Sequence, residues 1–250
     1  MSRTPLLAGN WKMHTTISAA RELAAAIAAG PITSGRQVLL APPMTALAAV
    51  GESLSGSPVE LGSQNICWEE QGAFTGEISP AMLKDVGGTM AIIGHSERRA
   101  IFGETDQLIN TRVKGALSHG IIPILCIGET LEQRENGSTM ALLEEQLKAG
   151  LAETSLDSGA QLVVAYEPVW AIGTGKTATS RQAQEVHAFV RNLLGKLYQK
   201  DIAGQIRILY GGSVNPANVD ELMGQEDIDG ALVGGAALKA DSFLAIINFN

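Results

Sequence analysis

The chain has 250 residues, 45% of them hydrophobic, so it can bury a large core as one barrel or as two small domains. Its 18 basic and 26 acidic residues give a net charge of −8 without any basic block, which argues against nucleic acid as a partner. The two cysteines, Cys67 and Cys126, lack metal-site spacing and are too few for a disulfide-rich secreted scaffold. The first apolar run stops at Asn10, too early for a signal peptide or a membrane span. We therefore expect a cytoplasmic protein without a membrane partner.

Short runs of β-branched or aliphatic residues recur along the chain and predict eight strands. Most of these runs are continuously hydrophobic rather than alternating, as strands covered on both faces of a parallel sheet must be. They span residues 6–11, 37–41, 59–65, 89–95, 121–128, 162–167, 206–211 and 230–234. Parallel strands need helical crossovers between them.

Helix start signals lie between these runs. They are Ser79 before Pro80, Asn215 before Pro216, and Thr179 with Gln182 three residues later, which fits a capping box. No linker or low-complexity tract interrupts the alternation of strands and helices. Residues 1–250 are therefore expected to form one domain of eight βα units, a (β/α)8 TIM barrel.

In such a barrel the active site is assembled at the carboxyl ends of the strands. The polar and small residues at the predicted strand ends should therefore lie on one rim. They are Asn10 and Lys12 after the first run, His95 after the fourth, Cys126 in the fifth, Glu167 after the sixth, Gly211-Gly212-Ser213 after the seventh and Gly234-Gly235 after the eighth.

Glu167 is the candidate general base. A solvated strand-end carboxylate is the commoner situation. Here Pro168 stiffens the chain after Glu167, and the apolar residues Trp170 and Ile172 follow. Closure of this segment would exclude water from the carboxylate and make it a stronger base.

His95 and Lys12 are the candidate partners of that base, although single residues of either type are more often structural or surface residues. A helix start, Ser96-Glu97-Arg98-Arg99, follows His95 directly. Its dipole disfavours a second proton on the ring, so a neutral imidazole could donate a hydrogen bond to a substrate oxygen. Lys12 lies just past a strand end on a rim that is short of cations, and a phosphorylated substrate needs one.

The glycines after the seventh and eighth runs indicate a phosphate site, because barrels of this class often bind phosphate there through backbone N–H groups. Taken singly, each pair of glycines could simply form a tight turn. A competing phosphate motif, Gly175-Lys176-Thr177, would need a glycine at position 170 to form a nucleotide-binding loop. That position holds Trp170, which excludes the motif.

The assembled residues resemble the triosephosphate isomerase family from end to end, with no departure at a functional position. The matching motifs are Gly9-Asn10-Trp11-Lys12, Ile93-Gly94-His95-Ser96-Glu97-Arg98-Arg99, Ala165-Tyr166-Glu167-Pro168-Val169-Trp170-Ala171-Ile172-Gly173-Thr174-Gly175, Tyr210-Gly211-Gly212-Ser213-Val214 and Gly234-Gly235-Ala236.

The resemblance implies interconversion of dihydroxyacetone phosphate and glyceraldehyde 3-phosphate without a metal or an organic cofactor. Glu167 would remove a proton from the carbon beside the carbonyl, and neutral His95 would polarise the carbonyl and move protons between the enediolate oxygens. Lys12 and Asn10 would hold the developing charge and orient the substrate, with Glu97 anchoring Lys12. Backbone N–H groups would hold the phosphate at Gly173, Ser213, Gly234 and Gly235.

The resemblance also implies a homodimer, because in the family the loop after the third strand enters a neighbouring subunit. Residues 65–78, which include Cys67, Trp68, Phe74 and Thr75, resemble that loop. The other reading is a long loop folded on its own chain. A second function class also stays open, a barrel that binds phosphometabolites without catalysis, because fold alone does not establish activity.

Overall fold

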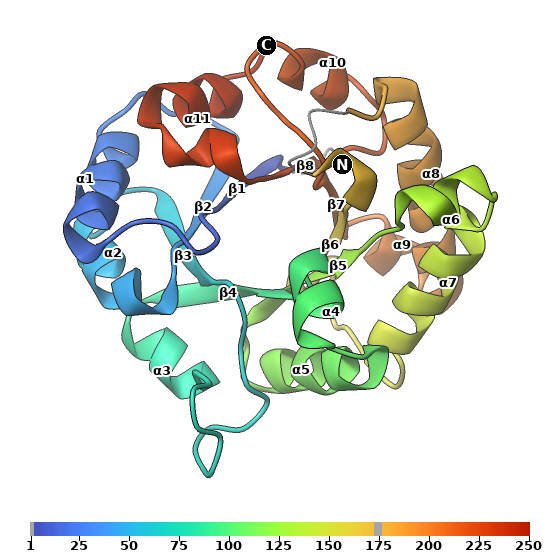
Figure 1. Cartoon of the computed structure of the whole chain (residues 1–250), viewed down its shortest axis with the longest axis horizontal. Helices are drawn as coiled ribbons and strands as arrows, with labels where there is room; N and C mark the ends of the chain where they lie inside the picture. Colours follow the sequence, from blue (N-terminus) through green and yellow to red (C-terminus); the bar gives the residue numbers. More distant parts are fainter. Residues whose placement is uncertain (1–2, 173–176) are drawn as a thin grey trace.

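The computed structural model describes residues 3–172 and 177–250. Within these ranges eight parallel strands pair in chain order, and β1 also pairs with β8, so the sheet closes into a barrel. In Figure 1 the strands lie at the centre and the helices surround them. The predicted (β/α)8 barrel is confirmed. The strands are β1 Leu6–Asn10, β2 Gln37–Ala41, β3 Val59–Ser63, β4 Gly88–Ile93, β5 Ile122–Ile127, β6 Val163–Tyr166, β7 Arg207–Tyr210 and β8 Gly230–Val233.

The helices follow the strands around the outside of the barrel. They are α1 Ile17–Ala28, α2 Leu47–Ser53, α3 Pro80–Asp85, α4 Ser96–Phe102, α5 Asp106–Ser118, α6 Leu131–Glu135, α7 Thr139–Gly150, α8 Ser180–Leu197, α9 Lys200–Ala203, α10 Val219–Met223 and α11 Ala240–Ile247. Short 3-10 helices lie at η1 Met44–Ala46, η2 Gly159–Gln161, η3 Val169–Ala171 and η4 Gly235–Leu238.

Both faces of the strands are buried, which explains their continuous hydrophobicity. Leu6 and Ala8 of β1 belong to an apolar cluster whose members alternate along the strands and fill the barrel. Leu7, between them, belongs to a second cluster that packs the strands against the helices. A parallel sheet covered on both faces needs apolar side chains at successive positions.

Two of the three helix starts predicted between the strands are confirmed, and α4 begins at Ser96 as expected. Ser79 caps α3 with its side chain, and Thr179 forms the expected capping box at the start of α8. The third, at Asn215, is wrong by about one turn, because α10 begins at Val219. The Asn215 side chain instead accepts a hydrogen bond from the Ala217 N–H and holds a separate turn.

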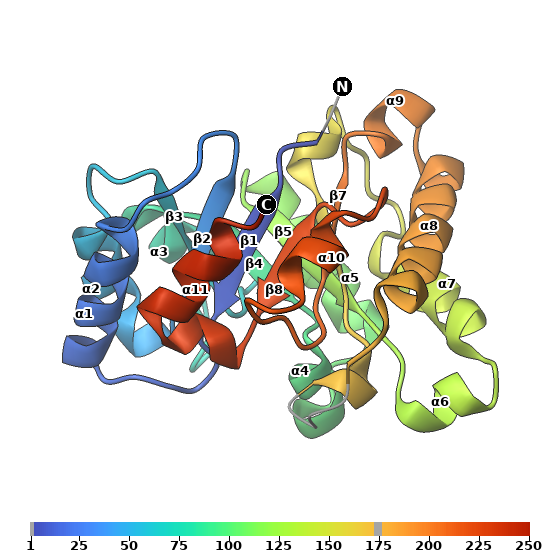
Figure 2. The same cartoon turned by 90° about the horizontal axis from the view of Figure 1, so that it is seen from above.

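The two ends of the barrel differ in what they carry. Figure 2 shows the molecule from the side, with α4 and α6 at one end and the N-terminus at the other. Because α4 follows β4 after two residues, and α6 follows β5 after three, this end carries the carboxyl ends of the strands. The loop between β3 and α3 projects outward beyond the ring of helices, as the teal loop of Figure 1 shows.

Candidate active site

A cavity of about 330 Å³ opens at the carboxyl ends of the strands. Glu97 lies in an adjoining hollow of about 200 Å³, whose lining also includes Lys12 and His95. Gly173 lies outside the described residues. The larger cavity brings together the other residues that the sequence predicted for the site, which are Asn10, Lys12, His95, Glu167, Ser213, Gly234 and Gly235.

Glu167 directly follows β6, and only 2% of the residue is exposed. Its Oε1 lies 2.9 Å from His95 Nε2, and its Oε2 accepts a 2.8 Å hydrogen bond from the Ser96 N–H. Burial raises the pKa of Glu167, but His95, the Ser96 N–H and Lys12 outweigh burial and lower the pKa below its ordinary value. Neighbouring donors therefore hold this buried carboxylate in its ionised form.

Glycines on the two neighbouring strand ends make room for Glu167. A Cβ atom at Gly128 would lie 1.8 Å from the Glu167 carbonyl oxygen, and one at Gly211 would lie 2.9 Å from Glu167 Cγ. Neither distance allows a side chain without moving the carboxylate or its backbone. Gly211, which the sequence associated with phosphate binding or a tight turn, is therefore also required for the space beside Glu167.

His95 caps the N-terminus of α4, where its Nδ1 accepts a 3.2 Å hydrogen bond from the Glu97 N–H. The proton of a neutral ring therefore lies on Nε2, facing Glu167. Burial lowers the pKa of His95, but the Glu167 and Glu97 carboxylates outweigh burial and raise it above its ordinary value. The helix start and the Glu97 N–H favour the neutral ring expected from the sequence, whereas Glu167 favours the imidazolium. The charge of His95 thus depends on where Glu167 lies.

Lys12 reaches from the end of β1 to the start of α4. Its Nζ lies 2.6 Å from Glu97 Oε1, so the two side chains form an ion pair. A Cβ atom at Gly234 would lie 3.5 Å from Lys12 Cε, which places the lysine stem beside the end of β8 as well. The ammonium group therefore lies where the first, fourth and eighth strands meet the cavity.

Sequence reasoning missed Glu129, which is completely buried. Glu129 Oε1 accepts hydrogen bonds from the Tyr166 hydroxyl at 3.0 Å and from Trp170 Nε1 at 2.9 Å. These two donors lie on either side of Glu167 in the chain. The signal was present, because Glu129 follows β5 after a single glycine, in the kind of strand-end position that pointed to Glu167.

Cys126 is fully buried on β5. Among the residues that the structure describes, no group of three His, Cys, Asp or Glu side chains is arranged to hold a metal ion. Within the same residues, no helix has the length and apolar character needed to cross a membrane.

Comparison with known proteins identifies the family. A family model described as triosephosphate isomerase matches residues 5–250. The chain belongs to the triosephosphate isomerase family. The resemblance seen in the sequence motifs is thereby confirmed.

Other members of the triosephosphate isomerase family match nearly the whole chain. The triosephosphate isomerase of Roseiflexus sp. (strain RS-1) is 56% identical over 248 residues, which cover 99% of this chain and 98% of that protein. The enzyme of Carboxydothermus hydrogenoformans is 54% identical over 246 residues, or 98% of each chain. That of Chloroflexus aurantiacus is 52% identical over 248 residues, or 99% of each chain.

Proposed function

We propose that the chain interconverts dihydroxyacetone phosphate and D-glyceraldehyde 3-phosphate by proton transfer through an enediolate, with Glu167 as the base and His95 as the hydrogen-bond donor to the carbonyl. The observation that carries these roles is the 2.9 Å contact between Glu167 Oε1 and His95 Nε2 at the cavity. A base and a donor this close together can act on adjacent atoms of one small substrate. The proposed reaction uses no metal and no organic cofactor.

Substrate binding activates the base in this arrangement. Because Nδ1 of His95 accepts from the Glu97 N–H, a neutral ring offers the cavity one N–H, on Nε2. A substrate carbonyl oxygen that takes this N–H displaces Glu167 Oε1 from it. The carboxylate then loses one of the contacts that lower its pKa and becomes a stronger base beside the substrate carbon.

The proton transfers then follow in order. Glu167 removes a proton from the carbon beside the carbonyl, and the electron pair of that bond forms the enediolate while negative charge moves onto the carbonyl oxygen. His95 moves a proton between the two enediolate oxygens, and Glu167 returns its proton to the neighbouring carbon. Lys12 and Asn10 stabilise the developing charge, and Glu97 anchors the Lys12 ammonium.

The phosphate group is proposed to bind at the loops after β7 and β8. Ser213, Gly234 and Gly235 line the cavity there, and Lys12 supplies a nearby positive charge. Backbone N–H groups at this position form the phosphate site of many barrels. Gly173 is proposed to add a further N–H contact. Binding energy from the phosphate would help to close the segment that begins at Pro168 over the substrate.

A coupled assay of glyceraldehyde 3-phosphate formation, on purified protein without added metal, tests this function. Glu167→Gln should lower kcat by about 10²–10⁴-fold, the usual contribution of a positioned general base. Glu185→Gln, an exposed carboxylate of α8, is the matched control and should keep wild-type turnover. Near-normal turnover of Glu167→Gln would assign the base to another residue. Binding of dihydroxyacetone phosphate by the wild type without any isomerisation would favour the non-catalytic barrel.

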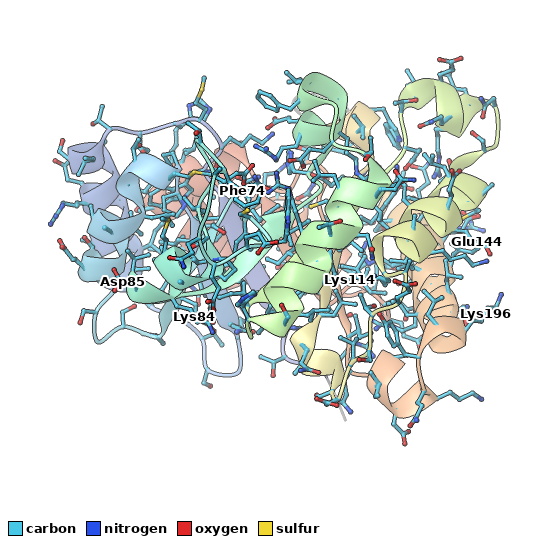
Figure 3. The ribbon with its side chains drawn as sticks, turned by 90° about the horizontal axis from the view of Figure 1, so that it is seen from below. Phe74, Lys84, Asp85, Lys114, Glu144 and Lys196 are labelled. Carbon is cyan, nitrogen blue, oxygen red and sulfur yellow. The ribbon has the colours of Figure 1, made fainter. Side chains whose placement is uncertain are left out.

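A homodimer is proposed on the basis of the projecting loop, residues 65–78. Arg112 of α5 donates 2.8 Å hydrogen bonds to both carboxylate oxygens of Glu77, and Trp68 packs edge-on against Phe74 with ring centroids 5.3 Å apart. Contacts within its own chain thus hold the loop in the projecting position that Figure 1 shows. Figure 3 looks onto this loop, with Phe74 labelled on it and Lys114 on α5.

Exposed apolar side chains surround the hollow that such a loop could enter. Met13 is 94% exposed, Ile101 71% and Phe102 69%. Met13 and Phe102 line the 200 Å³ hollow beside Lys12 and His95. A second copy of the chain that inserts residues 65–78 there would cover this apolar surface.

Light scattering after size-exclusion chromatography tests the dimer. The expected mass is twice the 26.2 kDa of one chain. Phe102→Asp should shift the protein to the monomer, whereas Leu131→Asp, on α6, should not. A wild-type protein that elutes only at 26.2 kDa would show that the loop folds on its own chain.

A single domain over residues 1–250 and a cytoplasmic location are also proposed. Pairing of β1 with β8, which joins the first and last strands, supports the single domain. The two unpaired cysteines, Cys67 and Cys126, support a reducing compartment. Limited proteolysis that yields two separately folded fragments would contradict the first proposal, and recovery of the protein outside the cytoplasm on cell fractionation would contradict the second.

A further inference from the structure

Lys12 has a left-handed backbone, with a φ of +50°. Residues other than glycine rarely adopt this conformation, and they keep it only where surrounding contacts hold them. Such strain is concentrated at functional sites. The contacts that hold Lys12 therefore bear on where its ammonium group lies.

Both backbone polar groups of Lys12 are bound by side chains. Its N–H donates a 3.0 Å hydrogen bond to Asn10 Oδ1, and its carbonyl oxygen accepts a 2.8 Å hydrogen bond from Gln64 Nε2. The same Nε2 atom donates a 2.9 Å hydrogen bond to the carbonyl oxygen of Ala41, the last residue of β2. Because Gln64 itself follows β3, its amide fixes the strained residue to two neighbouring strand ends.

The backbone conformation decides where the lysine side chain goes, because φ and ψ set the direction of the Cα–Cβ bond. In the left-handed conformation Lys12 reaches Glu97 and the substrate cavity. Relaxation to an ordinary φ would redirect the stem and draw the ammonium group away from both. Gln64 lines the adjoining hollow rather than the substrate cavity, so it contacts the Lys12 backbone without lining the cavity itself.

We propose that Gln64 is a positioning residue, whose amide holds Lys12 in the left-handed conformation and thereby places the ammonium group against the substrate. The proposal rests on the role proposed for Lys12 in the isomerase reaction. A purely structural role, in which the amide only joins the ends of β2 and β3, makes a different prediction.

A double-mutant cycle separates the two roles. Gln64→Met removes both donated hydrogen bonds at nearly constant side-chain length. It should lower kcat/KM by about ten- to hundredfold, which is the rate factor that corresponds to the free energy of the backbone strain at Lys12. Once Lys12→Met has removed the ammonium group, Gln64→Met should cause no further loss. The dissociation constant for inorganic phosphate should follow the same pattern, and it stays measurable where turnover is too slow.

Asn110→Leu is the matched control. Asn110 Nδ2 on α5 also donates to two backbone carbonyl oxygens, at 3.0 Å to Gly150 and 2.9 Å to Ala152, but away from the cavity. This variant should lower Tm and leave kcat/KM at the wild-type value. Each variant is studied as full-length protein, and light scattering confirms that it retains the wild-type oligomeric state.

The outcomes are distinct. If Gln64→Met lowers kcat/KM by the same factor with Lys12 present or absent, or no more than Asn110→Leu does, the positioning role is overturned. If Lys12→Met alone keeps wild-type kcat/KM and phosphate affinity, that result contradicts the role proposed for Lys12 in catalysis, on which this inference rests. A Gln64→Met loss that vanishes in the Lys12→Met background supports the inference.

Discussion

Trp170 Nε1 donates a 2.9 Å hydrogen bond to Oε1 of the completely buried Glu129. The same oxygen accepts a 3.0 Å hydrogen bond from the Tyr166 hydroxyl. Tyr166 directly precedes Glu167, and Trp170 follows it by three residues. One carboxylate therefore binds side chains on both sides of the proposed base. The segment that leaves β6 is therefore attached to the end of β5.

Substitutions of Glu129 should separate its hydrogen bonds from its charge. Burial raises the pKa of Glu129 in the folded protein. Such a carboxyl group lowers the free energy of unfolding once the pH exceeds the pKa that it has in the unfolded chain. Glu129→Gln keeps an acceptor for both donors without a buried charge, so its free energy of unfolding at pH 7 should equal or exceed that of the wild type. Glu129→Leu removes the acceptor of both hydrogen bonds, so the free energy of unfolding should fall by about 2–6 kcal/mol. Urea unfolding at fixed protein concentration measures the free energy of unfolding of both variants. An equal loss of stability in Glu129→Gln and Glu129→Leu would contradict this account.

His187 should make the free energy of unfolding fall in acid. It is fully buried, and its Nδ1 lies 3.1 Å from the Asp227 carbonyl oxygen. Burial lowers the pKa of His187 to about 4. The unfolded chain binds this proton below about pH 6.5, so the free energy of unfolding should fall as the pH drops from about 6.5 to about 4, by about 3 kcal/mol in total.

His187→Asn tests this pH dependence, because asparagine can still donate to the Asp227 carbonyl oxygen but does not titrate. Urea unfolding of both proteins across that pH range should give a flatter profile for the variant. His14→Asn, at an exposed position, serves as the control. Parallel profiles for wild type and His187→Asn would assign the acid sensitivity to other groups.

Gly211→Ala should impair catalysis by moving Glu167, the proposed base. The added Cβ would lie 2.9 Å from Glu167 Cγ, and a displacement of about 1 Å in a catalytic group can cost about 10²-fold in rate. Gly195→Ala provides the matched control, because a Cβ there meets nothing within 4 Å inside α8. It should gain about 0.5–1 kcal/mol of stability and keep wild-type kcat/KM. Unchanged activity in Gly211→Ala would mean that Glu167 can move without cost.

His95→Gln should shift the pH profile of kcat/KM as well as lower it. Burial raises the pKa of Glu167 and the charge of His95 lowers it, so the neutral amide should let that pKa rise. Because the base acts only when ionised, the acid limb of the kcat/KM profile should move to higher pH. His119→Gln, at the end of α5, should leave the limb in place. If the acid limb of His95→Gln stays at the wild-type pH, His95 does not set the pKa of Glu167.

The strands and the barrel could be predicted because burial on both faces leaves an unbroken apolar pattern such as Leu6 to Ala8. Strand order then put Asn10, His95 and Glu167 on one rim, since parallel strands present their carboxyl ends together. The two confirmed helix starts rest on side chains that bond their own backbone. Asn215 shows the limit of this signal, because the same bond can close a turn that does not continue as a helix.

Contacts between distant segments could not be predicted in the same way. The space that Gly128 and Gly211 leave for Glu167 depends on the register of β5, β6 and β7. The left-handed backbone of Lys12 and its bond to Gln64 have no local sequence pattern, because lysine does not prefer that conformation. The roles proposed for the site residues stay predictions until the variants are measured.

Closure of the barrel has a consequence for synthesis on the ribosome. Gly9 of β1 pairs with Val233 of β8, so Lys12 meets Gly234 and Gly235 only once β8 has been made. A nascent chain that has released β1 to β7 carries Glu167 and His95 but lacks the phosphate contacts proposed for Gly234 and Gly235. We therefore expect isomerase activity to appear only once β8 has been made, and we expect chains that stop before β8 to lack it.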